Sequence, residues 1–338
     1  SGADPGPASY GRGGDHPAVT DCDVLLGLLD PGYFLGGDMP LDESLAAAAL
    51  APVAAALGLS VEDTAAGVHD VVNQNMAAAA RMHAVEQGVD LRGVSVIAFG
   101  GAGPVHACGL AELLDSDRVI FPINASVLSA FGTLVTPVRI DLARSMVRAL
   151  DGTEATAERE ALLDELRTEG RRVLAAAGVP ADAVRFRYGI DARYTGQGNE
   201  ITVWVGEGEV WPATAEEVRR RFDEDYERIY GLTIPDVGVE AVTWRLSAFA
   251  TNAPVEPAPD LAPGGAAVPH GSRAARFTRA GGRQEVPVYR RDALGPGARF
   301  DGPAIVEERE TTAVIRPGWS VEVAADGSLV ATRTRSDA

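Results

Sequence analysis

One short stretch constrains the fold of this chain more than any other. Val94–Phe99 is an apolar run rich in β-branched residues, which is typical of a buried strand. Gly100, Gly101 and Gly103 follow, and glycines permit positive φ angles and let a ligand approach the backbone closely. Pro104 then suits the first position of a helix, where a missing N–H costs nothing. The sequence therefore predicts a strand, a tight turn and a helix N-terminus, whose free N–H groups attract anions or polar heterocycles.

The rest of the chain alternates between the two periodicities of regular structure. Helical patterns occupy residues 41–57, 60–87, 105–114, 126–134, 153–177 and 214–230. Strand patterns occupy residues 118–121, 186–194, 200–205, 240–250, 304–306, 313–315, 320–323 and 328–331. Alternation of this kind predicts an α/β fold with at least partly parallel strands.

Composition shifts divide the chain into four predicted parts. An α/β domain spans residues 1–150, and an α+β domain spans residues 151–252. A linker or long loop rich in Pro and Gly covers residues 253–275, and a small β-rich module covers residues 276–338. Within the first part, turn-forming residues crowd positions 1–40, so we expect a long ordered loop or a disordered arm there.

Composition also excludes several classes of function. The net charge of −18 argues against nucleic acid or an anionic membrane as a partner, because both require a basic face. The chain contains no lysine, which excludes a Walker-type phosphate loop and a Schiff-base lysine within it. No apolar run approaches the length of a membrane span. Two cysteines cannot form a disulfide framework, so a cytoplasmic location is the simplest expectation.

A few polar residues are candidates for chemistry. Asp4 and Asp21 stand among several acids in the first 40 residues, where they either wrap a divalent cation or simply form turns. His106 follows the glycine turn and faces either a ligand or the core. Asn73, Asn75 and Arg81 interrupt the apolar face of the 60–87 helix; they either line a cleft or bond to a loop. Gln197 and Asn199 are assigned to a turn.

Twelve short motifs, spread in order over nearly the whole chain, carry a resemblance to one enzyme family. They are Ser1–Gly14, Val19–Asp21, Gly27–Pro31, Tyr33–Gly37, Met39–Asp42, Asn75–Met76, Ala98–Ala107, Ser129–Gly132, Arg193–Gln197, Tyr289–Arg290, Gly302–Ile305 and Pro317–Gly318. In these motifs the chain resembles the hydantoinase A/5-oxoprolinase family. Two departures are Val89–Arg92, where an Asp-Pro-Arg is usual, and Ser9, where the family often has cysteine.

The resemblance implies an ATPase lobe of the actin/hexokinase/Hsp70-like (RNase H-like) fold over the first 150 residues. In that fold, a turn such as Gly100, Gly101, Ala102, Gly103 and Pro104 contacts the adenosine of ATP. Matching family positions also raise Asp21 and His106 as catalytic candidates. The same family positions imply that Asp4, Asp21 and His106 are candidate metal ligands, either for the Mg²⁺ that accompanies ATP or for a second divalent metal.

The family's two phosphate-binding hairpins, each with an Asp-x-Gly-Gly-Thr core, do not occur in this sequence. The resemblance therefore implies the C-terminal portion of an enzyme whose partner is an N-terminal ATPase half, with a hydantoinase B-type subunit as a further partner. The implied activity is ATP-dependent ring opening of a cyclic amide such as a hydantoin or 5-oxoproline. The alternatives are a subunit of an ATP-dependent ketone carboxylase and a non-catalytic assembly subunit. A third hypothesis treats Ser1 as an N-terminal nucleophile.

Overall fold

The computed structural model describes residues 2–150, 156–250, 262 and 264–334. Its contacts divide the chain into two compact units. The first unit comprises Ser1–Gly132 and Pro257–Ala338, and the second comprises Thr133–Glu256. Each unit has hydrophobic core clusters of its own, one in the second unit and two in the first. The two units are therefore described separately.

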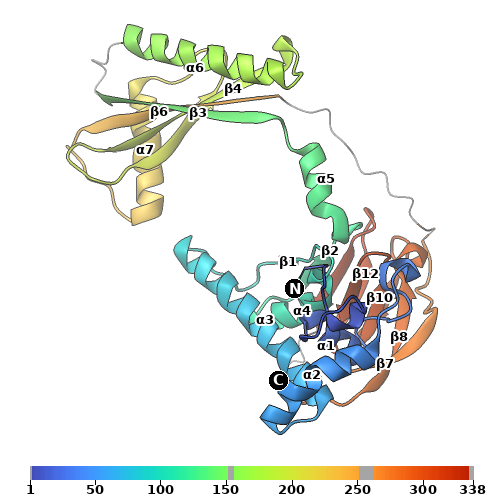
Figure 1. Ribbon diagram of the computed structural model, residues 1–338. Helices are drawn as coiled ribbons and strands as arrows, with labels where there is room; N and C mark the ends of the chain where they lie inside the picture. Colours follow the sequence, from blue (N-terminus) through green and yellow to red (C-terminus); the bar gives the residue numbers. More distant parts are fainter. Residues whose placement is uncertain (1, 151–155, 251–261, 263, 335–338) are drawn as a thin grey trace. The chain divides into compact units, whose positions relative to one another are not determined.

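Four helices of the first unit pack beside its strands (Figure 1). They are α1 (Val19–Leu25), α2 (Glu43–Leu57), α3 (Val61–Glu86) and α4 (Gly103–Leu113), with short 3-10 turns at Ala8–Tyr10, Phe34–Gly37, Ala125–Val127 and Arg291–Ala293. The side chain of Asp42 accepts hydrogen bonds from two N–H groups at the start of α2, and Gly58 ends this helix in a left-handed conformation. The side chain of Ser60 caps α3 by accepting a hydrogen bond from the N–H of Asp63. The predicted helices at 41–57, 60–87 and 105–114 are confirmed.

Two sheets complete the first unit. One has the strand order β1-β2-β13-β12-β9, and the other has the order β11-β10-β8-β7. Their bounds are β1 (Val96–Ile97), β2 (Arg118–Phe121), β7 (Gly271–Ala275), β8 (Gln284–Arg290), β9 (Arg299–Asp301), β10 (Ala304–Glu307), β11 (Thr312–Ile315), β12 (Trp319–Val323) and β13 (Leu329–Arg333). The pairs β1–β2 and β8–β10 are parallel, so the predicted partly parallel α/β character is confirmed.

The second unit is one antiparallel sheet with two long helices. The strand order is β3-β6-β4-β5, and α6 packs along β3 and β6 while α7 packs against β5. The bounds are β3 (Arg139–Ala149), α6 (Thr156–Ala176), β4 (Val184–Tyr194), β5 (Ile201–Glu207), α7 (Ala215–Tyr230) and β6 (Val239–Ala250), with a 3-10 turn at Ala181–Ala183. Helix α5 (Leu128–Val135) crosses the boundary between the units.

The structure groups the chain differently from the four predicted parts. Strands β12 and β13 do not form a separate sheet with their neighbours, because β13 pairs along the whole of β2. Residues of β2, β12 and β13 share one hydrophobic core, which includes Phe121, Trp319 and Leu329. Burial of that shared apolar surface joins residues 276–338 to the α/β domain. Residues 253–261 and 263 of the predicted linker at 253–275, and Ser1, lie outside the described residues. The last five residues of that segment form β7.

Residues 2–40 are an ordered segment built around a short helix. Helix α1 (Val19–Leu25) lies within it, and Leu26, Leu28 and Leu29 enter the core. Among the described residues, no single helix is long and apolar enough to cross a membrane. Helices α2 and α3 meet that criterion only as a pair, and this pair is bent by 88° at its break.

Candidate functional site

The glycine turn joins β1 to α4 and is fixed by two contacts from distant parts of the chain. Gly100 has a φ of 89°, and its N–H donates to the carbonyl of Ala125 at 2.8 Å. The hydroxyl of Thr311 donates to the carbonyl of Gly101 at 2.8 Å. Helix α4 begins at Gly103, so Pro104 is its second residue, one position later than predicted. The backbone of the turn is therefore held in one conformation before any ligand binds.

The outer side of this turn is open. In the described part of the chain, no heavy atom beyond the adjoining backbone lies within 4 Å of a Cβ built on Gly100 or on Gly103. A Cβ on Gly101 would meet only the carbonyl oxygen of Glu310, at 3.7 Å. Packing therefore does not require glycine at Gly101 or Gly103. Of the three glycines, only Gly100 has a positive φ angle, which favours glycine there. The turn leaves room for a ligand to approach its backbone.

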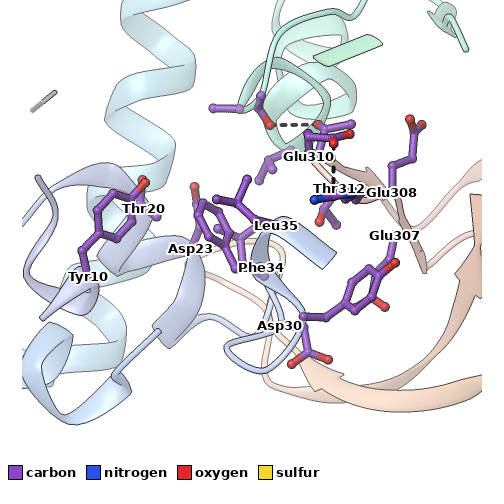
Figure 2. Close-up of a pocket in the computed structure, with 17 residues that line it drawn as sticks. Tyr10, Thr20, Asp23, Asp30, Phe34, Leu35, Glu307, Glu308, Glu310 and Thr312 are labelled. Carbon is purple, nitrogen blue, oxygen red and sulfur yellow. Dashed lines mark hydrogen bonds and ion pairs between the residues drawn. The ribbon is translucent and has the colours of Figure 1, made fainter. Parts of the chain in front are cut away.

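A cavity of about 200 Å³ lies against this turn, and Figure 2 shows the residues that line it. Tyr10, Phe34 and Leu35 from the start of the chain supply an apolar wall. Five carboxylates also line the cavity: Asp23, Asp30, Glu307, Glu308 and Glu310. Gly101 and Ala102 of the turn complete it. The cavity is thus acidic with one apolar side, and it adjoins the predicted nucleotide turn.

Charged partners hold the acids of β10 and its following turn in place. Glu307 is 2% exposed; it pairs with Arg273, and its second oxygen lies 3.6 Å from a guanidinium nitrogen of Arg290. The guanidinium of Arg290 also lies 3.3 Å from the ring centre of Tyr33. Burial raises the pKa of the Glu308 carboxyl, whereas the guanidinium of Arg291, 3.5 Å away, lowers it.

A buried polar cluster adjoins the cavity and comes from three helices. Asp23 of α1, His69 and Asn73 of α3 and His106 of α4 are each 5% exposed or less. His69 Nδ1 lies 2.8 Å from Asp23 Oδ1, and His106 Nε2 lies 3.6 Å from Asp23 Oδ2. His106 Nδ1 lies 3.1 Å from Asn73 Oδ1. The two imidazole rings are stacked, with centroids 4.5 Å apart. Asp23 itself lines the cavity, so the cluster borders it.

The surroundings of His106 lower its pKa below the ordinary value of 6.5. Burial lowers the pKa of His106, the carboxylate of Asp23 raises it, and the neighbouring His69 lowers it again. With Asn73 Oδ1 as its acceptor, the Nδ1 atom carries the ring proton and the Nε2 atom presents a lone pair. That lone pair faces a carboxylate oxygen of Asp23.

The sequence candidates are placed very differently from one another. His106 joins the buried cluster, whereas Asp4 is exposed. Asp21 is completely buried, but its two oxygens accept N–H groups of Ala8, Ser9 and Ala18 at 2.8–3.1 Å. Its observed contacts thus hold the first loop against α1. Among the described residues, the group with metal-ligand spacing is Asp23, His69 and His106, and it includes neither Asp4 nor Asp21.

The three polar residues that sequence analysis singled out on α3 also lie in different surroundings. Asn73 is buried against His106, Asn75 is exposed, and Arg81 donates to the carbonyl of Leu113 in α4. Outside the site, Gln197 donates from its turn to the hydroxyl of Tyr226 at 2.9 Å. Sequence reasoning missed His69, and it raised Asp23 only as one of the several acids of the first 40 residues. One signal was available: His69 and Asn73 are four residues apart, so they lie on one face of the helix.

Comparisons with known proteins agree on one family. The model of the hydantoinase/oxoprolinase family matches residues 1–142, and that of the hydantoinase/oxoprolinase C-terminal domain matches residues 149–327. The caprolactamase subunit alpha of Pseudomonas jessenii is 33% identical over 329 residues, which are 96% of this chain and 47% of that protein. The acetone carboxylase beta subunit of Xanthobacter autotrophicus is 29% identical over 314 residues, 89% of this chain and 44% of that protein.

Solved structures agree with this match. The crystal structure of an ATP-dependent caprolactamase from Pseudomonas jessenii has a TM-score of 0.78 at 31% identity, covering 99% of this chain and 49% of that one. Nucleotide-free acetone carboxylase, from a study of ATP-dependent acetone carboxylation, has a TM-score of 0.76 at 26% identity, covering 97% and 48%. The chain thus spans about half the length of the relatives it matches. It belongs to the hydantoinase/oxoprolinase family.

Proposed function

We propose that this chain is the adenosine-side, C-terminal portion of an ATP-dependent hydrolase that opens a cyclic amide. The observation that carries the proposal is the open glycine turn at Gly100–Pro104, fixed by Thr311 and placed beside an acidic cavity. Two structural relatives are described as ATP-dependent or as acting in ATP-dependent carboxylation. The missing Cβ atoms leave a cradle along the backbone that a flat heterocycle such as adenine would fill.

In this proposal, the residues of the chain bind and orient rather than transfer phosphate. Gly100, Gly101, Ala102, Gly103 and Pro104 would lie along the adenosine. ATP would supply a phosphoryl group that converts the amide oxygen into a better leaving group. The triphosphate and its Mg²⁺ would be held by an N-terminal half, because this sequence has neither lysine nor an Asp-x-Gly-Gly-Thr hairpin.

The lining of the cavity favours a cyclic amide over a ketone. An ionised carboxylate only accepts hydrogen bonds, and a lactam or hydantoin offers an N–H donor whereas a ketone offers none. Phe34 and Leu35 would contact the aliphatic part of the ring. The carboxylase relatives keep a ketone carboxylase as the second candidate.

Nucleotide titration tests the two-part arrangement. We expect calorimetry to show weak ATP binding by this chain alone and tight binding after co-expression with an N-terminal half. Equally tight binding and full turnover by the chain alone would contradict the arrangement.

Phosphate release by the assembled protein then distinguishes the substrate classes: we expect stimulation by caprolactam, 5-oxoproline or hydantoin. Stimulation only by acetone with bicarbonate would instead favour the carboxylase.

Assembly and location follow as parts of the same proposal. Relatives of this chain are described as alpha, beta and gamma subunits, which supports association with a hydantoinase B-type subunit. Both cysteines are free and buried, which is compatible with a cytoplasmic protein. A non-catalytic assembly role is less well supported, because a scaffold has no need of buried His and Asp side chains beside a cavity.

A further inference from the structure

We propose that Asp23, His69 and His106 bind one divalent transition-metal ion, distinct from the Mg²⁺ that accompanies ATP. The site lies at the wall of the cavity, because Asp23 lines that cavity. Metal binding by these residues does not depend on the proposed function, since it is measured without nucleotide and without an N-terminal half.

The first argument is an unbalanced pair of acceptors. In the tautomer whose Nδ1–H donates to Asn73 Oδ1, the Nε2 lone pair of His106 faces Asp23 Oδ2 across 3.6 Å. Two acceptors buried this close repel one another unless a positive charge lies between them. Water competes poorly here, because the three side chains are 6% exposed or less. A metal ion bound between them would satisfy both atoms at once.

The second argument is distance. The donor atoms of the three residues lie within 4.8 Å of one another. Zinc–nitrogen bonds of about 2.0–2.1 Å in a tetrahedron place neighbouring ligand atoms about 3.3 Å apart. Asp23 Oδ1 lies 2.8 Å from His69 Nδ1, and Asp23 Oδ2 lies 3.6 Å from His106 Nε2, so each imidazole has one carboxylate oxygen near that spacing. Each of these two contacts differs from that value by about half an ångström or less.

The third argument is that the surrounding structure holds the three ligands in place. Each ligand comes from a different helix, and α3 packs against both α1 and α4. Asn73 fixes the ring of His106, as a hydrogen-bond partner typically does for a metal-bound histidine. Gly109 allows this approach, because a Cβ there would lie 2.9 Å from Asn73 Nδ2. Two imidazoles and one carboxylate suit Zn²⁺, Co²⁺ or Fe²⁺ better than Mg²⁺ or Ca²⁺, which prefer oxygen ligands.

Cobalt titration of the metal-free chain tests the proposal. The chain is stripped with a chelator and titrated with Co²⁺, and the visible absorption bands of the bound ion are followed. Zn²⁺ then displaces the Co²⁺, and elemental analysis gives the stoichiometry. We expect one equivalent of metal, together with a rise in the thermal midpoint when Zn²⁺ is added. Absence of stoichiometric binding by the wild-type chain would overturn the proposal, whatever the variants do.

Variants assign the ligands. Asp23→Asn and His69→Gln should each weaken Co²⁺ binding by at least about 100-fold, and Asn73→Ala by about 10–100-fold through the loss of orientation. His83→Gln is the matched control, because His83 lies on the same helix with 76% of its side chain exposed. Unfolding curves recorded without metal separate lost binding from lost folding. Unchanged Co²⁺ affinity in folded Asp23→Asn and His69→Gln would also overturn the assignment.

Discussion

At the scale of single residues, two carboxylates on the short helix α1 have different roles. Asp21 and Asp23 are both buried in α1. Asp21 satisfies backbone N–H groups of the loop before the helix, whereas Asp23 faces the histidines of α3 and α4. Because the polypeptide turns by about 200° over two helical residues, neighbouring acids of this kind point to different sides. Sequence spacing alone does not separate these two tasks.

The first prediction concerns Asp21. In Asp21→Asn, the amide nitrogen would face backbone donors that the carboxylate now accepts, so at least one buried N–H would lose its partner. We expect a loss of about 2–4 kcal/mol in the free energy of unfolding, measured in urea. Asp15→Asn is the control: the Asp15 side chain is 88% exposed, so its change should stay within about 0.5 kcal/mol. Equal effects of the two substitutions would contradict this assignment.

The second prediction concerns the glycine turn. Gly103→Ala adds a methyl group where the described structure leaves open space, so the unfolding free energy of the chain should change by no more than about 0.5 kcal/mol. The same methyl group would occupy the path of a bound adenosine. We therefore expect ATP affinity of the assembled protein to fall by about tenfold or more, measured by calorimetry.

Gly67→Ala on α3 is the matched control for that experiment. A Cβ at Gly67 also meets no heavy atom within 4 Å in the described structure, and this glycine does not line the cavity. We expect it to stabilise α3 slightly and to leave ATP affinity unchanged. If Gly103→Ala bound ATP as tightly as Gly67→Ala, the turn would not contact the nucleotide.

At the scale of elements, one ion pair ties the start of α3 to the segment after β7. Asp63 accepts from the Ser60 hydroxyl and from Arg276, whose Nη2 lies 2.8 Å from Asp63 Oδ1. These partners, with the hydroxyl first, hold the pKa of Asp63 below its ordinary value of 3.8. A lowered folded-state pKa means that the stabilisation is present above the unfolded-state pKa and is lost as the pH falls through the folded-state value.

The third prediction follows from this pH dependence. Asp63→Asn should reduce the stability of the chain at pH 7, and the difference from wild type should shrink toward zero as the pH falls below the lowered folded-state pKa of Asp63. Urea unfolding at a series of pH values measures the difference. A difference that stayed constant down to acid pH would mean that the charge of Asp63 contributes nothing.

The sequence predicted the elements whose patterns are strong and local. The glycine turn, the helices α2, α3 and α4, and the mixed α/β class are confirmed. Strand β3 was missed because most of its residues alternate between exposed and half-buried positions and carry many arginines. Helix α1 was missed because turn-forming residues surround it. His69 was missed because its partner Asp23 is 46 residues away, and helical periodicity says nothing about such a partner.

At the scale of the whole molecule, the two units have separate cores. The core of the second unit is built from residues of α6, α7 and its own four strands. Its centre includes Tyr194, which packs edge-on against Phe222. A unit that buries its apolar residues against its own elements is expected to fold by itself.

The fourth prediction is therefore that residues 133–256 fold independently. The isolated fragment should unfold in one cooperative thermal transition, and the full chain should show two transitions by calorimetry. Phe222→Ala should lower the stability of the second unit by about 3–5 kcal/mol and leave the other transition unchanged. A shift of both transitions by this substitution would show that the units unfold together.

The pairing of β2 with β13 and the contact of Thr311 with Gly101 have a consequence for biosynthesis. Thr311 follows Gly101 by 210 residues, and β13 lies beyond it. At about 5–20 residues per second, the ribosome needs about 10–40 s to cover that interval. During this time a newly made β2 has one unpaired edge and exposes the apolar side chains of Val119 and Phe121, so the growing chain is a natural client for chaperones. A message cut short before Thr311 would yield a protein that carries the glycine turn but lacks the hydroxyl that locks it.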